Sequence, residues 1–309
     1  MKRTYKYLFG PVPSRRFKRS LGVDLTPFKT CSLDCIFCQL GRTPEKTILR
    51  KEYVPIDEVI SELEQWLAVD GQADYITLSG SGEPTLHSRF GEVLQYVRQH
   101  SDIPSVLLTN STMLSQPEVR EAACGADIVK MSLSAWDQAS FEWVNRPHSQ
   151  LQFDRLIQGQ IDFRAQFKGK VWMEVFLLEA INATPDNVRK IARLAKKIGP
   201  DRIQLNTAIR PPAEDFASPV HTEQMNELAR LFDPVAEVIA EYKTDCLTSI
   251  AANQDRIFSM LQRRPCTAKE ITEVFGMHIN EVSKYLGNLV RTNQVRTERK
   301  KTNIYYTAC

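Results

Sequence analysis

Three of the chain's seven cysteines lie within eight residues of one another, and their spacing is the first chemical signal in the sequence. Cys31, Cys35 and Cys38 form the pattern C-x-x-x-C-x-x-C. Thiolates on one short loop can converge on a cluster of iron and sulfide. A 4Fe–4S cluster that is fully bound by protein needs four thiolates, so this loop would leave the fourth iron open to another ligand.

Two other interpretations of these cysteines are open. They could bind a structural zinc ion, although such sites take four ligands and the next histidine in the chain is His87. They could also be ordinary buried thiols, because free cysteine packs as a small apolar residue. The remaining cysteines are scattered along the chain, and we interpret them as structural: Cys124, Cys246, Cys266 and Cys309.

A turn that contains two glycines follows the next apolar run. Residues 75–78 have the pattern of a strand, and residues 79–84 then read Ser-Gly-Ser-Gly-Glu-Pro. Glycine at the end of a strand lets a ligand approach the backbone closely, although a tight strand-to-helix turn would need the same glycines. The candidate ligand-binding residues of this turn are Ser79, Gly80, Ser81, Gly82 and Glu83.

Polar residues also follow later strands of the predicted fold. Asn110 comes after the run at 106–108, and Ser132 and Ser134 lie at the end of the run at 128–133. Chemistry in barrel proteins collects at such strand ends, although each residue could instead cap a following helix. Glu174 lies in the fifth strand, and the sequence alone does not decide whether it points inward.

The cysteine spacing, with Phe37 directly before the last cysteine, resembles the signature of the radical S-adenosylmethionine (SAM) superfamily, C-x-x-x-C-x-aromatic-C. The turn at 79–84 is similar to that family's G-G-E-P motif, with Ser81 in place of the second glycine of the usual pair. The resemblance implies that the three cysteines hold a 4Fe–4S cluster whose open iron binds SAM. Electron transfer then splits SAM into methionine and a 5′-deoxyadenosyl radical, which abstracts hydrogen from a substrate.

The same resemblance implies roles for the other candidate residues. Phe37 would border the adenine of SAM, and Gly80, Gly82 and Glu83 would place its methionine part. Polar residues in the positions of Ser132 and Ser134 would contact ribose and carboxylate, and Asn110 is a further cofactor-binding candidate.

A narrower resemblance covers roughly residues 5–240. Residues 9–16 (F-G-P-V-P-S-R-R) and 205–207 (L-N-T) look like a branch related to the wyosine-forming tRNA enzymes. Those enzymes carry further cysteines upstream for a second cluster that engages pyruvate, and this chain has no cysteine before Cys31. The resemblance therefore implies the radical SAM half-reaction and leaves wyosine chemistry open.

The elements that position these residues alternate between apolar runs and helical stripes. Predicted strands cover residues 22–25, 75–78, 106–108, 128–133, 171–178 and 202–205. Predicted helices cover 55–69, 90–97, 116–123, segments across 137–167, 185–198 with Thr184 as cap, and 222–242. Six strands that alternate with helices predict an α/β fold with a parallel sheet, and the length favours an incomplete (β/α)6 TIM-like barrel, which is also the core fold of the family. Residues 10–21 read as an ordered loop.

The pattern changes near residue 245. Helices are predicted at 252–262, at 268–275 with Thr267 as cap, and from a cap at Asn280 to about residue 290; strands follow at 294–299 and 303–307. Three helices and a basic hairpin predict a winged helix-turn-helix. We therefore expect two domains, 1–245 and 246–309, joined by a linker at 245–252.

Composition and charge limit the class of protein. The chain has 309 residues and a net charge of +3, and no run reaches the roughly 20 apolar residues of a membrane span. The N-terminus lacks the long apolar segment of a secretory signal, and clustered cysteines suit a reducing compartment, so we expect a cytoplasmic protein without a membrane partner. Residues 1–50 carry eleven Lys and Arg residues against three acidic ones, and residues 291–301 are basic again.

The leading hypothesis is a radical SAM enzyme, an iron–sulfur oxidoreductase or transferase with an unidentified substrate and a role in RNA modification. It would take electrons from a donor such as flavodoxin or ferredoxin. The winged helix would bind tRNA or DNA, with a protein-docking role as the alternative, through Asn280, Ser283, Lys284, Asn288, Arg291, Arg296, Arg299, Lys300 and Lys301. A second hypothesis is a transcription regulator that senses SAM or redox state through the cluster and binds DNA through the winged helix.

Overall fold

The core of the fold is one eight-stranded sheet whose strand order follows the chain. A computed structural model describes residues 5–14, 16–69, 71–239, 254–300 and 303–309. The strands are β1 (Leu8–Ser14), β2 (Lys18–Val23), β3 (Tyr75–Leu78), β4 (Ser105–Thr109), β5 (Ile128–Ser132), β6 (Lys170–Leu177), β7 (Arg202–Thr207) and β8 (Glu237–Val238). Strands β2 to β8 run parallel to one another, and β1 is antiparallel to β2. The sheet is that of a partial TIM-like barrel, as predicted.

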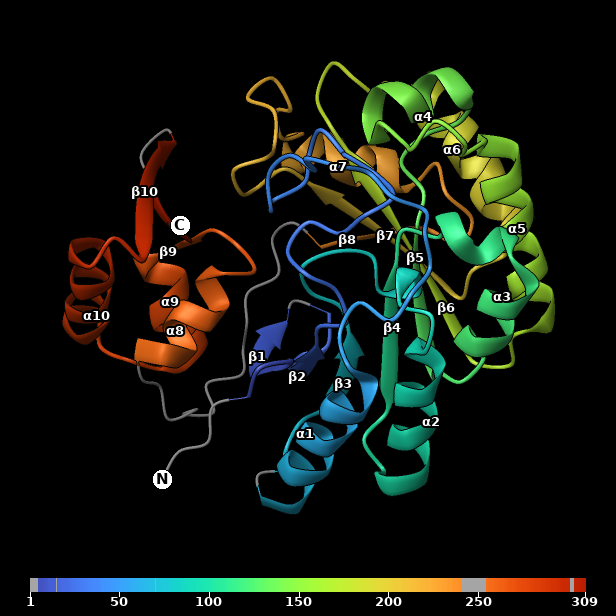
Figure 1. The fold of residues 1–309 in the computed structure, drawn as a ribbon. Helices are drawn as coiled ribbons and strands as arrows, with labels where there is room; N and C mark the ends of the chain where they lie inside the picture. Colours follow the sequence, from blue (N-terminus) through green and yellow to red (C-terminus); the bar gives the residue numbers. More distant parts are fainter. Residues whose placement is uncertain (1–4, 15, 70, 240–253, 301–302) are drawn as a thin grey trace.

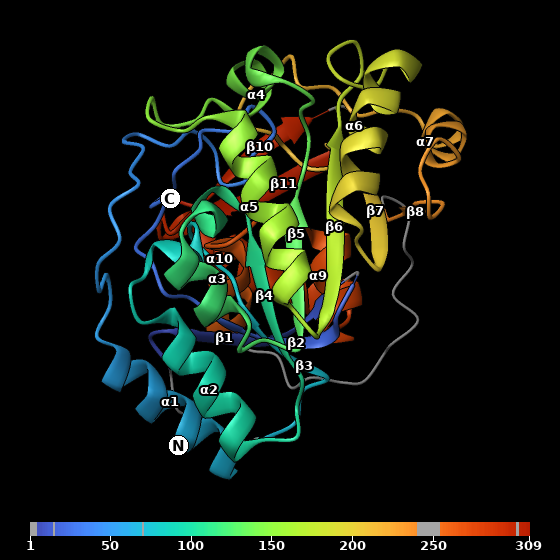
Figure 2. The same ribbon diagram turned by 90° about the vertical axis from the view of Figure 1, so that its right-hand side faces the viewer.

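Helices cover one face of this sheet. They are α1 (Ile56–Val69), α2 (Phe90–His100), α3 (Pro117–Ala123), α4 (Gln138–Asn145), α5 (Phe153–Gln166), α6 (Pro185–Ile198) and α7 (Thr222–Ala229), with short 3-10 turns at Pro84–Leu86 and Thr112–Ser115. Figure 2 shows α2, α3, α5 and α6 in front of strands β3 to β6. The main hydrophobic core lies between these helices and the sheet, since the two layers bury their apolar faces against each other.

The predicted loop at 10–21 is wrong, because most of it forms the hairpin of β1 and β2. Leu8 pairs with Val23 and Ser14 with Lys18, and the register shifts between Phe9 and Val12. Two prolines and this irregularity hide the period-2 pattern that marks a strand. The predicted first strand at 22–25 correspondingly ends at Val23.

The predicted helix at 222–242 is also too long. Helix α7 ends at Ala229, and Pro234 lies only five residues further on, where its ring and missing N–H cannot continue a helix. The chain instead adds the two-residue strand β8 beside β7. Residues 240–242 of the predicted helix lie outside the described residues.

The C-terminal unit, residues 254–300 and 303–309, has its own hydrophobic core. It contains α8 (Gln254–Leu261), α9 (Ala268–Phe275) and α10 (Ile279–Arg291), and a small sheet of β9 (Cys266–Thr267), β10 (Val295–Lys300) and β11 (Asn303–Ala308) in the order β10-β11-β9. Thr267 caps α9 as predicted, but the cap of α10 is His278, whose side chain accepts a hydrogen bond from Asn280 N. The name winged helix stays a prediction, as does the domain boundary; the predicted linker at 245–252 lies outside the described residues.

The C-terminal unit packs against the partial barrel beside β1 (Figure 1). The guanidinium of Arg263 lies 4.1 Å from the centre of the Phe9 ring, and its Nε is 3.8 Å from Asp24 Oδ2. Tyr305 donates a hydrogen bond to the backbone oxygen of Ile209 at 3.1 Å. Figures 1 and 2 place this unit on the side of the sheet opposite α2, α3, α5 and α6.

Across the part of the chain that the structure describes, no helix has both the length and the apolar character needed to cross a membrane.

Candidate cofactor and substrate site

A cavity of about 420 Å³ lies between the loop that holds Cys31, Cys35 and Cys38 (the cysteine loop), the inner face of the sheet and the C-terminal unit. Phe37 and Cys38 form its wall on the side of the cysteine loop, and Gly80 and Gly82 contribute from the turn after β3. The barrel strands and the C-terminal unit complete the lining with Lys130, Glu174, Asn206, Met260, Arg263 and Arg264. The structure therefore brings the cysteine loop and the turn at 79–84 to one cavity.

Each of the three clustered sulfurs lies within hydrogen-bond distance of a polar side chain. Lys29 Nζ lies 3.1 Å from Cys38 Sγ, Asn110 Nδ2 lies 3.5 Å from Cys31 Sγ, and Asn145 Nδ2 lies 3.3 Å from Cys35 Sγ. Donors to cysteine sulfur stabilise the thiolate and tune the potential of a cluster bound to it.

Lys29 and Asn145 were not among the predicted site residues. Lys29 lies two residues before Cys31, which is a local signal that could have identified it. Asn145 is 110 residues from Cys35 in the sequence, and only the fold brings them together.

Burial raises the pKa of the Cys31 thiol to about 12, and burial likewise raises the pKa of Cys35. Both thiols therefore hold their protons at neutral pH until a metal replaces them. Among the described residues, no three His, Cys, Asp or Glu side chains are placed to hold a single metal ion. Three cysteine thiols on one loop are the donor set of a cluster that has three cysteine ligands, each on a separate iron.

The turn at 79–84 is bound directly to the start of the cysteine loop. Lys29 N donates to Ser81 O at 2.7 Å, and Glu83 N donates to Thr30 O at 2.9 Å. A Cβ atom on Gly82 would lie 1.9 Å from Thr30 O, so only glycine fits there. The two motifs therefore form one packed unit.

Asp24 fixes the other half of this turn. Ser81 donates to the Asp24 carboxylate through its backbone N, at 3.0 Å, and through its Oγ, at 2.6 Å. Gly80 has a φ of +146°, and a Cβ there would lie 2.3 Å from the Asp24 carboxyl carbon. Ser79 lines the cavity beside it, and its N–H donates to Val23 O.

Glu83 is almost fully buried, and its carboxylate is occupied within the protein. Thr85 N, Thr85 Oγ1, Thr109 Oγ1 and Asn110 N all donate to it, at 3.1, 2.6, 2.7 and 2.7 Å. The side chain therefore ties the turn after β3 to the end of β4. A ligand at this turn would therefore contact backbone atoms and not the Glu83 side chain.

The other predicted residues lie near the cysteine loop. Phe37 stacks on Phe176 with ring centres 4.1 Å apart, and both rings line the cavity. Asn110, Ser132 and Ser134 come together around a separate, small cavity of about 20 Å³. Ser134 Oγ accepts a hydrogen bond from Phe176 N at 3.1 Å.

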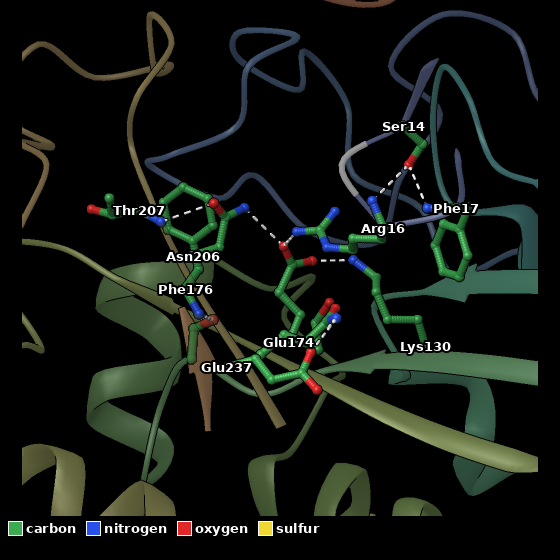
Figure 3. A network of polar contacts seen from close by, with 12 residues as sticks. Ser14, Arg16, Phe17, Lys130, Glu174, Phe176, Asn206, Thr207 and Glu237 are labelled. Carbon is green, nitrogen blue, oxygen red and sulfur yellow. Dashed lines mark hydrogen bonds and ion pairs between the residues drawn. The ribbon is translucent and has the colours of Figure 1, made fainter. Parts of the chain in front are cut away.

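Glu174 points into the barrel, which the sequence left undecided, and it is the centre of an ionic network (Figure 3). Arg16 and Lys130 both pair with its carboxylate, and Asn206 Nδ2 donates to it at 2.8 Å. Although burial alone would raise the pKa of Glu174, the charges of Arg16 and Lys130 hold it at about 2. Sequence reasoning missed Arg16 and Lys130 because their common partner lies over 40 residues from either.

The predicted nucleic-acid face of the C-terminal unit is partly occupied by internal contacts. Asn288 Nδ2 donates to Gln254 at 2.7 Å, and Lys300 Nζ lies 3.1 Å from Asp215 and 3.2 Å from Glu298. The side chains of Arg296 and Arg299 are exposed. Lys301 lies outside the described residues.

Comparison with known proteins gives a family match over more than half of the chain. Residues 25–199 match the Radical SAM superfamily. A UPF0026 protein of Methanocaldococcus jannaschii is 34% identical over 248 residues, which cover 80% of this chain and 76% of that protein. A UPF0026 protein of Helicobacter pylori strain J99 is 30% identical over 307 residues, 97% of each chain.

A third relative is much longer than this chain. It is a protein of Brachyspira hyodysenteriae named GTPase Obg, 36% identical over 298 residues. The match covers 95% of this chain but 44% of that protein, so this chain spans less than half of its length.

Two solved structures share the fold at low identity. A radical SAM methyltransferase from Sphaerobacter thermophilus superposes with a TM-score of 0.52 and 17% identity, over 72% of this chain and 66% of that one. SuiB of Streptococcus suis, bound to S-adenosylmethionine, gives 0.50 and 16%, over 68% and 45%.

Proposed function

We propose that this chain, which belongs to the radical SAM superfamily and is related in sequence to the UPF0026 proteins, is an enzyme that cleaves SAM reductively. It would abstract hydrogen from a substrate that is bound in the cavity. The cofactors of that family are a 4Fe–4S cluster and SAM. When bound, they supply an electron and a 5′-deoxyadenosyl radical. The residues of this chain hold, orient and enclose them.

One observation carries the proposal. Each clustered cysteine has its own hydrogen-bond donor, and the loop that holds them is packed on the turn at 79–84 at the wall of the cavity. A cluster on these sulfurs would therefore face the same space as the backbone of Gly80 and Gly82. A structural role alone needs neither the cavity nor a donor for every sulfur.

Two of the candidate groups have positions that suit SAM. The stacked rings of Phe37 and Phe176 offer an apolar surface for adenine. The backbone at residues 80–82 would take the methionine part, while Glu83 keeps that turn in place. Asn110, Ser132 and Ser134 line a separate small cavity, so their contact with SAM stays a prediction from the family resemblance. A flavodoxin or ferredoxin would supply the electron.

The cavity also limits where hydrogen can be abstracted. Its walls come from the cysteine loop, the sheet and the C-terminal unit, so that protein surrounds a bound substrate on these three sides. Enclosure keeps water and unintended partners away from a reactive intermediate.

RNA is a second candidate substrate, separate from a small molecule that fits inside the cavity. Arg296 and Arg299, exposed on β10, would contact phosphates, and neither lines the cavity. Binding of total tRNA that falls steeply with salt would support this role, because neutralised phosphates release counterions. Absence of any salt-dependent binding would contradict it.

Iron content and SAM binding test the assignment of the cluster. Anaerobic reconstitution should give roughly four irons per chain and an electron paramagnetic resonance signal of the reduced protein that changes when SAM is added. Cys35→Ala should lose most of the iron and the signal. Cys124→Ala, which changes a half-buried cysteine outside the cavity, is the matched control and should keep both. A Cys35→Ala protein with full iron and an unchanged response to SAM would contradict the assignment.

A further inference from the structure

Five cationic side chains line the cavity, and they come from distant parts of the chain: Arg16, Lys130, Arg210, Arg263 and Arg264. Four of them form ion pairs in which their side chains are only 8–15% exposed: Arg16, Lys130, Arg210 and Arg263. Positive charge at such low exposure is costly unless it is paired.

Carboxylates compensate only part of this charge. Arg16 and Lys130 share the single carboxylate of Glu174. Arg210 Nη2 pairs with Glu270 at 2.9 Å. The group of Arg16, Lys130 and Glu174 therefore contains two cations and one anion.

The group of Arg210, Arg264 and Glu270 also contains two cations and one anion. Arg264 lies near enough to Arg210 and Glu270 to interact with both, and its Nη2 donates to the sulfur of Met260 at 3.5 Å. Burial lowers the pKa of Arg264 and the nearby Arg210 lowers it further, whereas Cys266 and Glu270 raise it. Glu270 thus pairs with Arg210 and also acts on the charge of Arg264.

Arg263 has a carboxylate of its own, because its Nε lies 3.8 Å from Asp24. In the part of the chain that the structure describes, the carboxylates that interact with these five cations are Glu174, Glu270 and Asp24.

Donor atoms at the cavity also lack acceptors. Within the described residues, Nε of Arg16, Arg210 and Arg263 is buried and has no hydrogen-bond partner. Buried polar atoms in native proteins are nearly always paired, so these side chains are incompletely satisfied by the protein alone. The three Nε atoms themselves are closed off from the cavity, so a ligand there would compensate the positive charge through the other guanidinium nitrogens, and an anion with several oxygens suits them best.

We propose that the cavity binds a small substrate that carries a dianionic group, held between Arg16 and Lys130 on the barrel side and Arg210 and Arg264 on the other. A phosphate or a pair of carboxylates has this charge. Because Arg264 belongs to the C-terminal unit, that unit forms part of the substrate site. The inference rests on the proposed function, since it assigns the cavity's ligand as the substrate of that reaction.

The carboxylate of SAM is the competing ligand for these cations. It would lie at the cysteine loop and the turn at 79–84, and it carries one negative charge. If the cations served SAM, their removal would weaken SAM binding; if they serve the substrate, it would weaken the binding of the dianion alone.

Calorimetry on the reconstituted full-length protein, saturated with SAM, tests the proposal. Inorganic phosphate and succinate are titrated separately, so that the preferred anion distinguishes a phosphorylated from a dicarboxylic substrate. We expect one of them to bind, and Arg264→Gln and Arg16→Gln each to weaken it about tenfold or more, because each loses a charge-assisted hydrogen bond. Arg264→Lys should retain more affinity than Arg264→Gln, and Arg193→Gln, on the exposed side of α6, should leave it unchanged.

Three results would overturn the inference: no binding of either anion, equal affinity in Arg264→Gln and wild type, or a loss of SAM affinity in Arg264→Gln as large as the loss of anion affinity. Iron content of each variant shows whether it has folded. Formation of 5′-deoxyadenosine is measured on the same wild-type protein. If it is absent while anion binding depends on Arg264, the proposed reaction is wrong and the anion site remains; if it is present without anion binding, only the inference is wrong.

Discussion

The sulfurs of the cysteine loop receive their hydrogen bonds from three residues in three different places: Lys29, Asn110 and Asn145. Such donors lower the energy of negative charge on a bound cluster and so make its reduction easier. The charge of Lys29 has a larger effect than a neutral amide, because its hydrogen bond is charge-assisted.

Gly82 is the residue where the turn and the cysteine loop touch most closely. Gly82→Ala should lower both iron content and SAM affinity, because its Cβ would lie 1.9 Å from Thr30 O and push the loop away. Gly287→Ala is the control, since a Cβ there meets no atom within 4 Å. Full iron content in Gly82→Ala would show that the cysteine loop does not depend on this contact.

Glu174 gives a prediction for stability and pH. Glu174→Gln leaves Arg16 and Lys130 without their shared carboxylate, which should cost about 3–5 kcal/mol of unfolding free energy at pH 7. The folded pKa is about 2 and lies below the ordinary value, so the carboxylate's contribution is fully present above about pH 5 and is lost as pH falls toward 2. Urea unfolding at pH 7 and pH 4 checks this: the difference from wild type should shrink at pH 4.

Glu64→Gln, on the exposed side of α1, should change stability little at either pH. A wild-type stability for Glu174→Gln at pH 7, or a difference that grows on acidification, would contradict the ionic network.

At the scale of elements, docking of α8 on β1 depends on Arg263. Arg263→Ala should remove the contact with the Phe9 ring and the pair with Asp24. Amide hydrogen exchange should then become faster in Gln254–Leu261 and Leu8–Ser14, because local contacts set local opening. Lys284→Ala, exposed on α10, is the control. Unchanged exchange in both elements would mean that other contacts hold them together.

The elements differ in how far the sequence predicts them. Helix α6 could be predicted at both ends, because Thr184 caps it, Pro185 opens it and Gly199 in the left-handed region ends it. The hairpin of β1 and β2 could not, since its prolines and bulge remove the alternation that marks a strand. The end of α7 could have been predicted from Pro234.

The residues of the site also differ in how far the sequence predicts them. The cysteines and the turn at 79–84 are each recognisable from local spacing, and the structure places the two motifs in contact. The group around Glu174 has no local pattern, because Arg16 and Lys130 meet it only through the arrangement of β1, β2, β5 and β6. Glu83 was expected at the ligand, but its carboxylate is already used by Thr85, Thr109 and Asn110.

At the scale of the whole molecule, the partial barrel and the C-terminal unit have separate hydrophobic cores, and both units contribute residues to one cavity. A chain of residues 1–245 should therefore fold, since its core is separate, and should keep roughly the iron content of the full-length protein. It should lose the binding of phosphate or succinate, because Arg263 and Arg264 are absent. Iron analysis and calorimetry check the two parts. Aggregation of residues 1–245 would show that the C-terminal unit is needed to close the partial barrel.

The central claim is that this chain consumes SAM. The most direct measurement is the formation of 5′-deoxyadenosine by the reconstituted wild-type protein under anaerobic conditions with a strong reductant, followed by chromatography. We predict that 5′-deoxyadenosine accumulates with an equal amount of methionine, and that Cys35→Ala forms neither. Wild-type protein that binds SAM and leaves it intact would contradict the claim and favour a regulator that senses SAM, and formation of 5′-deoxyadenosine by Cys35→Ala at the wild-type rate would contradict the assigned cluster site.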